Sequence, residues 1–560
     1  MQGLNRSRMT GIIVAMLLGV QASVFAAPAP PDVPVPYRDP ASTAMQRSVQ
    51  QRQAYEGKQQ AQSEQKEGKV QVERPATEAG SQELHFQVRE IRLNRSALLT
   101  EEEIREAVAF DGPCEMTLAE LQQIVARINA LYQKKGQLTA MAVLPPQEVT
   151  AGLVKIRLVE GRYGQTTLKG NKRIAPDYVT ERITTPAGQL CDLQLLQKNL
   201  NLYNQTNTFP LQAKLVPGRS SGTTDVELEL QERENPWNTL LFADNANQDS
   251  SGLYRFGFVS QYYGLGKVDD RLLASGSWTN GTLSGFVSYD APISAEGTRA
   301  TFSYSRNRVK INHGEFKEME ITGNSNDLSA AISHPVYTSA SSKSELFAEV
   351  HHKWADTTVV FGDTLSRFDT NVLKVGCNWR SFDKQGMWFS QLSFSGFSTD
   401  TSSSWTPEEN LRGSYQNLYL LRRQNLGSNS FLLWRTLAQT STCEELPASE
   451  QISVGGMSTV RGYDESALSG YKGWVTGLEL NVPLTKNPQM LRGLTFIDYG
   501  EVQQRLGDMS MRSHLCSAGL GLEYNYLGWS GRVLVGVPLS TSDNVNKSKT
   551  RTHFYFQKSI

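Results

Sequence analysis

From about residue 236 to the last residue, apolar and polar residues alternate along short segments. Tyr254, Phe256 and Phe258, for example, alternate with Arg255 and Gly257. Side chains of a strand point alternately to its two faces, so these segments predict β-strands with one apolar and one polar face. We count roughly sixteen such segments of about ten residues each, the pattern of an outer-membrane barrel. They start near positions 236, 253, 270, 284, 298, 326, 343, 367, 386, 415, 428, 473, 492, 514, 529 and 550.

The connections between these predicted strands alternate in length. Those after the second, fourth, sixth, tenth, twelfth and fourteenth strands are short. Several of the others are long, at about 306–325, 353–366, 398–414, 439–472 and 539–549. Short turns at one rim and long loops at the other are typical of a transmembrane β-barrel. An even strand count places both barrel ends at the short-turn rim, and sixteen strands leave a water-filled lumen. The alternative is a large soluble sandwich or propeller.

The region from about 84 to 233 has a different pattern, which occurs twice. The first copy predicts a strand at 84–88, helices near 102–110 and 118–131, and strands at 138–144 and 154–158. The second copy predicts a strand at 166–169, helices near 176–183 and 193–203, and strands at 211–215 and 226–230. A repeat of about 75 residues in βααββ order predicts two copies of one small α+β domain, at 83–160 and 161–233.

Two cysteines occupy matching positions in these copies. Cys114 and Cys191 each come just before the second helix of a copy. In an oxidising compartment they could form a disulfide, and two thiols that never meet are the equally open alternative. The whole chain has five cysteines, which are too few for a disulfide-rich scaffold.

The first 26 residues are typical of a secretory signal peptide. Arg6 and Arg8 precede the apolar run Gly11–Val20, and Val24 and Ala26 suit a cleavage site after residue 26. The run is too short to be a permanent membrane helix, and no later segment has about 18 uninterrupted apolar residues. We therefore expect the mature protein to leave the cytoplasm, and to cross a membrane, if it does, as a closed barrel.

Residues 27–57 begin Pro-rich and continue Gln-rich, and Asp39-Pro40 is a good helix start. From residue 41 to 56 the predicted helix is polar on nearly every face, so no dry core can hold it. It is either disordered or placed in a wet cavity. Residues 58–82 are predicted to be a flexible linker.

The composition narrows the function. The chain has 560 residues, and 56 basic residues balance 56 acidic ones, which argues against nucleic-acid binding. Its seven histidines form no metal-ligand pattern, and the adjacent pair His351 and His352 should face opposite sides of a strand. Gly519 and Gly521 lie inside strand alternation rather than before a helix, and no nucleophile elbow is present. We expect no enzyme, catalytic residue, metal or cofactor.

Two motifs stand out in the barrel region. The longest connection, 439–472, contains Val454-Gly-Gly456 and then Val460, Arg461, Gly462 and Tyr463. Two strands later come Phe496, Asp498 and Gly500, in a Phe-x-Asp-x-Gly motif. With these motifs the chain strongly resembles the outer-membrane transporters of two-partner secretion, of the haemolysin-secretion and filamentous-haemagglutinin-secretion type. The resemblance covers nearly the whole mature chain.

The resemblance implies a fold and a site. It implies a helix (27–57) that plugs the pore and leaves it during transport, a linker, and two POTRA domains. A sixteen-stranded barrel (234–560) follows, whose sixth long loop, 439–472, folds back into the lumen. The loop's Arg461 is then expected to contact Asp498 on the inner wall. Physical chemistry supports this pair, because a charge-assisted and bidentate bond can offset the entropy lost when a long loop is ordered. Gly462 would allow a tight turn.

One residue departs from the usual pattern of such barrels, which commonly end in an aromatic residue. This chain ends in Ile560, although Phe554 and Phe556 keep the same parity and so the outward face. The departure puts the efficiency of barrel assembly in doubt.

The function implied by the resemblance is export without ATP of one large partner exoprotein from the periplasm to the cell surface. The partner would be a haemolysin, an adhesin or a contact-dependent toxin, bound through the POTRA domains. The transporter would be a monomer in the lipid of a Gram-negative outer membrane. The alternatives are a barrel-assembly insertase of the same superfamily, which usually has more POTRA domains, and a diffusion porin, which needs none.

Overall fold

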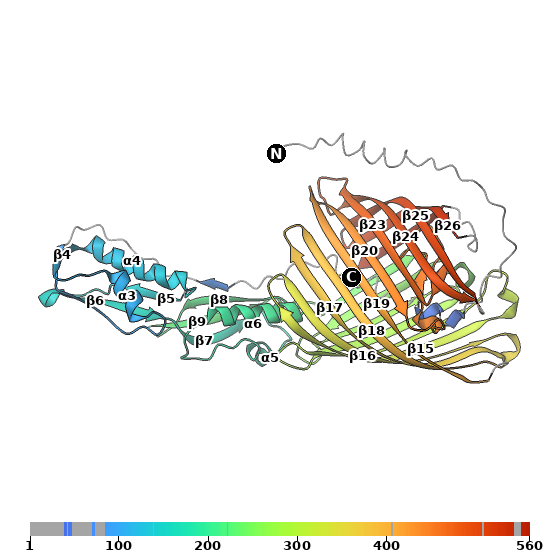
Figure 1. Cartoon of the computed structure of the whole chain (residues 1–560), viewed down its shortest axis with the longest axis horizontal. Helices are drawn as coiled ribbons and strands as arrows, with labels where there is room; N and C mark the ends of the chain where they lie inside the picture. The colour runs from blue at the N-terminus through green and yellow to red at the C-terminus, as the bar shows by residue number, and fades with distance from the viewer. Residues whose placement is uncertain are drawn as a thin grey trace.

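The computed structural model describes residues 39–41, 43–46, 70–72, 85–137, 139–220, 222–404, 407–506, 509–542 and 550–560. The predicted signal peptide, 1–26, lies outside the described residues, as does most of the linker predicted at 58–82. Two α+β domains form an arm that extends from one rim of a β-barrel (Figure 1).

The first α+β domain contains β2 (His85–Val88), β3 (Glu90–Leu93), α3 (Glu101–Val108), β4 (Cys114–Thr117), α4 (Leu118–Lys134), β5 (Ala140–Val143) and β6 (Leu153–Glu160). Both helices begin at a capping box, in which a threonine and a glutamate satisfy each other's backbone N–H groups: Thr100 with Glu103, and Thr117 with Glu120. One face of α4 packs on the sheet, which has the order β3-β6-β5. Among the described residues, no helix combines the length and apolar character needed to cross a bilayer.

The strand predicted at 84–88 is present as β2, but a second strand that was not predicted, β3, follows it directly. The chain bends at Arg89 between the two strands, so that β2 pairs with β4 and β3 pairs with β6. Apolar residues occupy even positions up to Val88 and odd positions from Ile91 onward. One continuous strand would therefore point the two sets to opposite faces and could not bury both against one core.

The second α+β domain repeats this topology. It contains β7 (Arg162–Lys169), α5 (Pro176–Thr180), α6 (Leu193–Thr206), β8 (Leu211–Pro217) and β9 (Thr223–Leu230). β3 pairs in parallel with β6 in the first domain, as β7 does with β9 in the second. In each domain this last strand also pairs antiparallel with the strand before it. The prediction of two βααββ domains before the barrel is confirmed.

One further strand comes from the segment predicted to be only a linker. β1 (Val70–Val72) pairs in parallel with β8 and extends the second sheet to the order β1-β8-β9-β7. Its residues Val70, Gln71 and Val72 lie beside Ala213, Lys214 and Leu215. The outer edge of β8 is therefore already occupied by the chain itself.

The two cysteines at matching positions do not form a disulfide, because all five cysteines are free. Cys114 lies exposed at the start of β4, whereas Cys191 is buried just before α6. Figure 1 shows β4 at the end of the arm away from the barrel. Burial raises the pKa of the Cys191 thiol to about 11.

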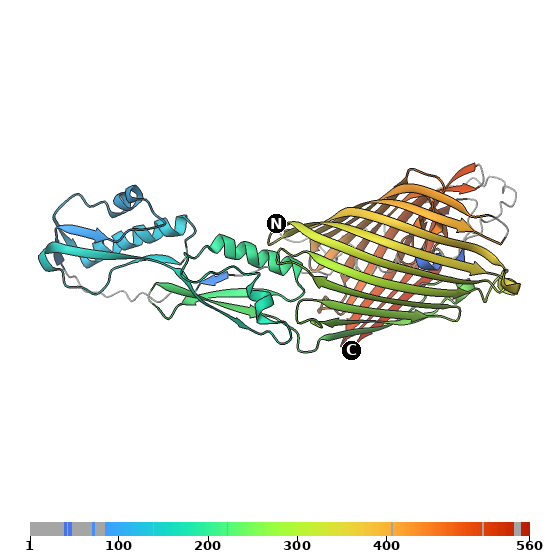
Figure 2. The same ribbon diagram turned by 90° about the horizontal axis from the view of Figure 1, so that it is seen from below.

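The rest of the chain forms a closed antiparallel barrel of sixteen strands, as the alternation predicts (Figure 2). Closure pairs the last strand with the first, for example Leu241 with Lys558. The strands are β10 (Trp237–Asp244), β11 (Arg255–Tyr263), β12 (Arg271–Trp278), β13 (Thr282–Pro292), β14 (Arg299–Lys310), β15 (Thr322–Thr338), β16 (Ser342–Thr358), β17 (Thr364–Asp383), β18 (Gly386–Ser402), β19 (Glu409–Gly427), β20 (Ser430–Ser441), β23 (Lys472–Pro483), β24 (Leu491–Leu506), β25 (Met509–Tyr526), β26 (Trp529–Thr541) and β27 (Arg551–Ser559).

Several strands are longer than the predicted segments. β15 to β19 have 17 to 20 residues each, so their ladders continue toward the rim with the long connections, which we call the long-loop rim. Alternation weakens there because both faces meet water, which hid these extensions from the sequence pattern.

The two faces of the barrel wall differ as a membrane barrel requires. Phe394 on β18 points outward and is half exposed, whereas its neighbours Ser393 and Ser395 are buried on the inner side. Phe556 and Ile560 at the chain end are also exposed on the outer face, so the terminal isoleucine keeps the apolar parity. The apolar outer band and polar lumen follow directly from strand alternation.

Candidate functional site

The connection between β20 and β23, which we call loop 6, folds back into the lumen. It contains a short hairpin of β21 (Ile452–Val454) and β22 (Leu468–Gly470), which pair antiparallel. The hairpin packs against β23 and β24 of the wall through a small apolar cluster that includes Val454 and Val502. Long loops are usually exposed, so the burial of this one indicates specific anchoring.

Arg461, in loop 6 between β21 and β22, is the centre of that anchoring. Its Nε donates to Asp498 Oδ2 at 2.7 Å, and its Nη2 donates to Asp498 Oδ1 at 2.9 Å. The backbone N–H of Arg461 also donates to Oδ2, at 3.1 Å. The structure thus brings together the two residues that the motif resemblance pairs, in a bidentate arrangement that is fully enclosed. Asp498 lies on the inner face of β24.

The wall around Arg461 contributes further groups. Its Nη1 donates to Glu479 on β23, and its guanidinium stacks 3.6 Å from the ring centre of Phe496. Arg532 on β26 lies 3.3 Å from Glu479, and Arg435 on β20 lies 3.7 Å from Asp498. Basic and acidic side chains therefore alternate along the network Arg435–Asp498–Arg461–Glu479–Arg532, whose wall residues come from four strands. Buried charges are tolerated only in such paired and hydrogen-bonded arrangements.

The next two loop residues fit closely against the wall. Gly462 has a φ of 95°, which favours glycine, and its N–H donates to His553 Nε2 at 3.1 Å. The hydroxyl of Tyr463 donates to the carbonyl oxygens of Cys516 and Ser540, at 2.9 and 2.7 Å. The loop tip is therefore held from β24 round to β27.

Val460, the first residue of the loop 6 motif, packs closely against Gly500, the last residue of the Phe-x-Asp-x-Gly motif on the wall. Val460 is completely buried. A Cβ on Gly500 would lie 2.5 Å from Val454 and 3.0 Å from Val460, so only glycine leaves room for the loop at this position. Val460 and Arg461 thus meet Phe496, Asp498 and Gly500 of β24, whereas Gly462 and Tyr463 contact the next strands of the wall, β25 to β27.

The N-terminal helix is also inside the barrel. Of the segment predicted at 27–57, residues 39–46 are described except for Ser42, and the helix begins at Pro40 as predicted. Figures 1 and 2 show this turn (blue) within the wall near the long-loop rim, and residues such as Ala41 and Met45 are buried there. Thr357 on β16 and Ser366 on β17 donate to Asp39 Oδ1, the latter at 2.6 Å.

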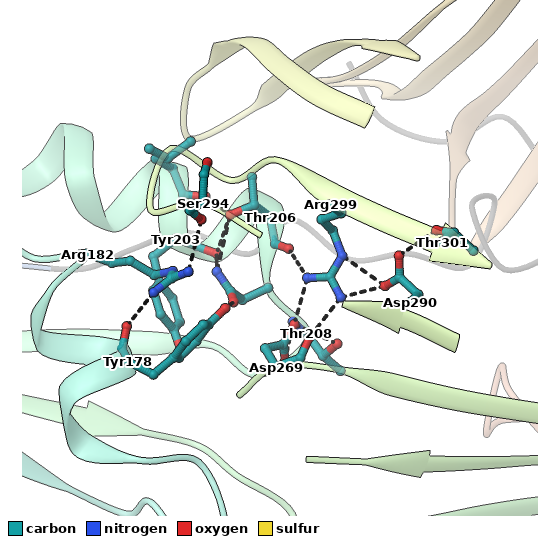
Figure 3. Close-up of polar contacts among 12 residues, drawn as sticks. Tyr178, Arg182, Tyr203, Thr206, Thr208, Asp269, Asp290, Ser294, Arg299 and Thr301 are labelled. Carbon is teal, nitrogen blue, oxygen red and sulfur yellow. Dashed lines mark hydrogen bonds and ion pairs between the residues drawn. The ribbon is translucent and has the colours of Figure 1, made fainter. Parts of the chain in front are cut away.

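At the opposite rim, which carries the short turns, the second α+β domain docks on the barrel (Figure 3). Arg299 at the start of β14 bonds Asp290 on β13 and donates to the carbonyl of Thr206, at the end of α6, at 3.2 Å. It also lies 3.3 Å from Asp269, which accepts two hydrogen bonds from the N–H of Thr208, at 3.0 and 2.9 Å. A cation at a helix C-terminus is electrostatically favourable.

Two more contacts complete this docking surface. Arg182 donates to the carbonyl of Ser294 in the β13–β14 turn, at 2.9 Å, and stacks 3.7 Å from the ring centre of Tyr178. Gln205 donates to the carbonyl of Ser339 in the β15–β16 turn, at 3.1 Å. Burial raises the pKa of Tyr178 to about 12, so its hydroxyl stays protonated and donates to Asn207.

Within the described part of the chain, no group of three or more His, Cys, Asp or Glu residues is placed to hold a metal ion. His351 faces the lumen and contacts Asp327, whereas His352 is exposed on the outer face. The two histidines therefore diverge, as alternation predicts.

Comparison with known proteins relates this geometry to a family. The family model described as "Haemolysin secretion/activation protein ShlB/FhaC/HecB" matches residues 222–524, more than half of the chain. The model of the ShlB-type POTRA domain matches residues 86–161, which cover the first α+β domain except for His85.

Individual relatives are distant but cover most of the chain. Heme/hemopexin transporter protein HuxB of Haemophilus influenzae (strain 86-028NP) is 23% identical, over 84% of this chain and 87% of that protein. Outer membrane transporter CdiB of Dickeya dadantii is 25% identical, over 95% of this chain and 96% of that protein.

Solved structures share the fold. CdiB from Escherichia coli matches with a TM-score of 0.67 and 20% identity, over 94% of this chain and all of that one. BamA from Haemophilus ducreyi lacking POTRA domains 1–3 matches with a TM-score of 0.53 and 13% identity, over 85% of this chain and 100% of that one.

Proposed function

The chain belongs to the haemolysin secretion/activation family ShlB/FhaC/HecB, and from that membership we propose the partner, the route and the gate of its transport reaction. It is an outer-membrane transporter of two-partner secretion, with its α+β domains in the periplasm. The partner is one large exoprotein of the haemolysin, adhesin or contact-dependent-toxin type. It enters unfolded at the short-turn rim and passes through the lumen to the cell surface.

The proposed gate is loop 6, and it is supported by the contact between Arg461 and Asp498, which we call the Arg461 clasp. Loop 6 lies in the lumen and is held by the Arg461–Asp498 pair, so it stands in the path of a passing chain. A bidentate pair with a supporting Glu479 fixes one closed position, yet it can be broken and remade without covalent change. Arg461 is therefore proposed to set the position of the gate, and Asp498 to receive it.

The partner would be recognised by strand addition to the α+β domains. An extended segment can add to the edge of a sheet, with main-chain hydrogen bonds giving affinity and alternate side chains giving specificity. In the second domain, β1 already occupies the edge of β8, so a partner strand there would take its place.

The direction of transport would come from the partner. Its folding outside the cell removes the emerging chain from the lumen and prevents its return, so the proposal needs no nucleotide, cofactor or catalytic residue. The transporter is proposed to be a monomer, which the closure of the barrel within a single chain supports.

A barrel-assembly insertase is the second candidate. The match to BamA supports a shared fold, at a TM-score of 0.53. Two α+β domains and a matching family of secretion proteins favour export.

The test of the gate is Arg461→Ala. The variant should assemble at normal levels and export less than about a tenth of the partner, because loss of a bond made by a buried charge costs several kcal/mol. The partner to use is the very large secreted β-helical protein expected in the neighbouring reading frame, measured in the culture medium.

The matched control is Arg512→Ala on β25. Arg512 also pairs with a carboxylate, Glu501, but its side chain is 76% exposed at the rim. Its loss should leave export unchanged. Wild-type export by Arg461→Ala would contradict the assigned role of loop 6, and absence of export by the wild type would contradict the proposed partner.

A further inference from the structure

Loop 6 contacts the barrel wall at a second place, on strands other than those that hold the motif residues. Glu450 ends a short 3-10 turn (Ala448–Glu450) just before β21. Its Oε1 accepts a hydrogen bond from Lys353 Nζ on β16 at 2.6 Å, and its Oε2 accepts one from the hydroxyl of Tyr415 on β19, also at 2.6 Å. In the closed sheet β20 and β23 lie between β19 and β24, which binds Arg461, and β16 lies three strands beyond β19.

This second contact is built as a buried ion pair. The side chains of Lys353 and Glu450 are only 8% and 3% exposed. Ser449 adds a donor to Oε1 at 2.8 Å, and Gln439 donates to the backbone carbonyl of Glu450 at 2.9 Å. Both carboxylate oxygens are therefore satisfied, as an enclosed charge requires.

The residue after Glu450 touches the N-terminal helix. The side-chain amide of Gln46 donates to the backbone carbonyl of Gln451. Gln46 is buried, so this contact is enclosed between the helix and loop 6. Loop 6 therefore forms one side of the helix's seat.

The other side of the seat is on the same strand that holds Glu450. Thr357 lies four residues after Lys353 on β16, and both face the lumen. Thr357 donates to Asp39 at the start of the helix. A Cβ on Gly323, on the neighbouring β15, would lie 2.8 Å from the Cβ of Ala41, so the helix rests directly on the wall there. One strand thus holds both the helix and the base of loop 6.

We propose that the Glu450–Lys353 pair is a second anchor of loop 6, and that it positions the loop as the seat of the N-terminal helix. The helix and the base of the loop are then released together, whereas the Arg461 clasp holds the tip of the loop separately. Glu450 and Lys353 are positioning residues in this scheme. The inference rests on the proposed gating function and adds a mechanical link between the two segments that obstruct the lumen, loop 6 and the N-terminal helix.

The primary test is Glu450→Gln in the full-length chain, in planar lipid bilayers. We expect the time spent in the high-conductance state to rise by about tenfold, because the amide cannot replace a charged partner of Lys353. The charge-swapped double variant, Lys353→Glu with Glu450→Lys, should restore most of the wild-type behaviour. A purely structural role would not be rescued by the swap.

The helix itself is followed with Ala44→Cys, in a chain whose five native cysteines are replaced by serine. Ala44 is buried, so a hydrophilic maleimide should label it slowly in the wild-type background and about tenfold faster with Glu450→Gln. Unchanged labelling alongside raised conductance would overturn the link between loop and helix.

The matched control is Glu349→Gln. Glu349 on β16 likewise faces the lumen and pairs with a lysine, Lys374 on β17, at 3.0 Å. Unlike Glu450, it has described partners only on the barrel wall. Its loss should change neither conductance nor labelling. If Glu349→Gln and Glu450→Gln changed conductance and labelling equally, loss of any charged lumen residue would have the same effect. That result would overturn the proposal.

The last comparison uses a chain lacking residues 28–56. There Glu450→Gln should add little further conductance, because the helix that it releases is already gone. A full, additive effect in that background would contradict the shared seat.

If Glu450→Gln does not assemble, Tyr415→Phe serves instead, since it removes one hydrogen bond from Glu450 and keeps the ion pair. It should increase both signals to a smaller extent, and no increase would overturn the proposal. Wild-type export of the partner is measured in parallel. If the wild-type protein exports no partner, the proposed function is contradicted. If it exports normally but the Glu450 variants change neither conductance nor labelling, only this inference is contradicted.

Discussion

At the scale of single residues, the tip of loop 6 depends on contact between two backbones. A Cβ on Gly536 of β26 would lie 2.6 Å from the backbone nitrogen of Gly462 and 2.9 Å from the carbonyl carbon of Arg461. Backbone atoms cannot move aside as a flexible side chain can. Gly536 is absent from the two motifs, yet it leaves the space in which the motif arginine reaches Asp498.

We therefore predict that Gly536→Ala lifts the loop tip from the wall. Overpacking of this kind costs about 1–3 kcal/mol, enough to populate an open loop without preventing barrel closure. Protease cleavage within loop 6 on intact cells should become several-fold faster. Gly285→Ala on β13 is the control, because a Cβ there meets nothing within 4 Å. Equal protection of loop 6 in both variants would contradict the argument.

The sequence motif led to the Arg461–Asp498 pair but not to its surroundings. Glu479, Arg435 and Arg532 lie on three other strands, and no local pattern links them to Arg461. Their signal is weak but present: each is a charged residue at a lumen-facing position of a strand. Only the register of the closed sheet shows that these positions surround one point.

At the scale of elements, the end of α6 is held by a barrel arginine. Arg299 connects Asp290 of the wall with Asp269 and with the carbonyl of Thr206. Its side chain is only 14% exposed. The orientation of the second α+β domain over the barrel entrance should therefore depend on this residue.

Arg299→Ala should loosen that domain. Loss of one partner from a largely buried ion network costs about 3–5 kcal/mol, so alternative orientations become populated. Pulsed electron paramagnetic resonance between spin labels at Lys198 on α6 and Lys384 in the β17–β18 turn should show a broadened distance distribution. Arg422→Ala is the control, since Arg422 pairs with Asp383 at the same rim. A distribution as narrow as in the wild type would refute this role.

The linker strand gives a second prediction for an element. β1 contributes only three residues to the edge of β8, so one unsuitable residue should remove it. Gln71→Pro lacks a backbone N–H and disfavours a strand interior. Hydrogen exchange in residues 211–217 should become at least about tenfold faster, because the exposed edge loses its partner. Gln71→Ala keeps the backbone and should exchange as the wild type does; slow exchange in both variants would argue against a stabilising β1.

Element prediction succeeded where a pattern was local and failed where it was not. The helix begun by Pro176 follows from the proline in its first turn, and the strand Thr223–Leu230 follows from alternation that the sequence displays directly. β1 was missed because its pairing with β8 joins segments about 140 positions apart and a three-residue strand has no measurable period. The long ends of β15 to β19 were missed because water on both faces removes the apolar alternation.

At the scale of the whole molecule, two separate obstacles occupy one lumen. Loop 6 enters from the long-loop rim and is held by the wall at its tip and base. The N-terminal helix is covalently part of the same chain as the periplasmic domains, and β1 lies between them in sequence. A partner strand that displaced β1 would therefore act on the segment leading to the helix. Recognition at one end of the molecule and opening at the other are connected through that single stretch of chain.

Removal of residues 28–56 tests the contribution of the helix to closure. The described turn of this helix is buried against β15 to β17, so its absence should open part of the lumen to ions. We expect a severalfold higher mean conductance in planar bilayers, with Arg461→Ala raising it again because the loop remains. Asp39→Ala, which removes the acceptor for Thr357 and Ser366 but keeps the helix, should give an intermediate value. Conductance that stays at the wild-type level after deletion would mean that loop 6 alone closes the pore, and the helix would lose its role as a plug.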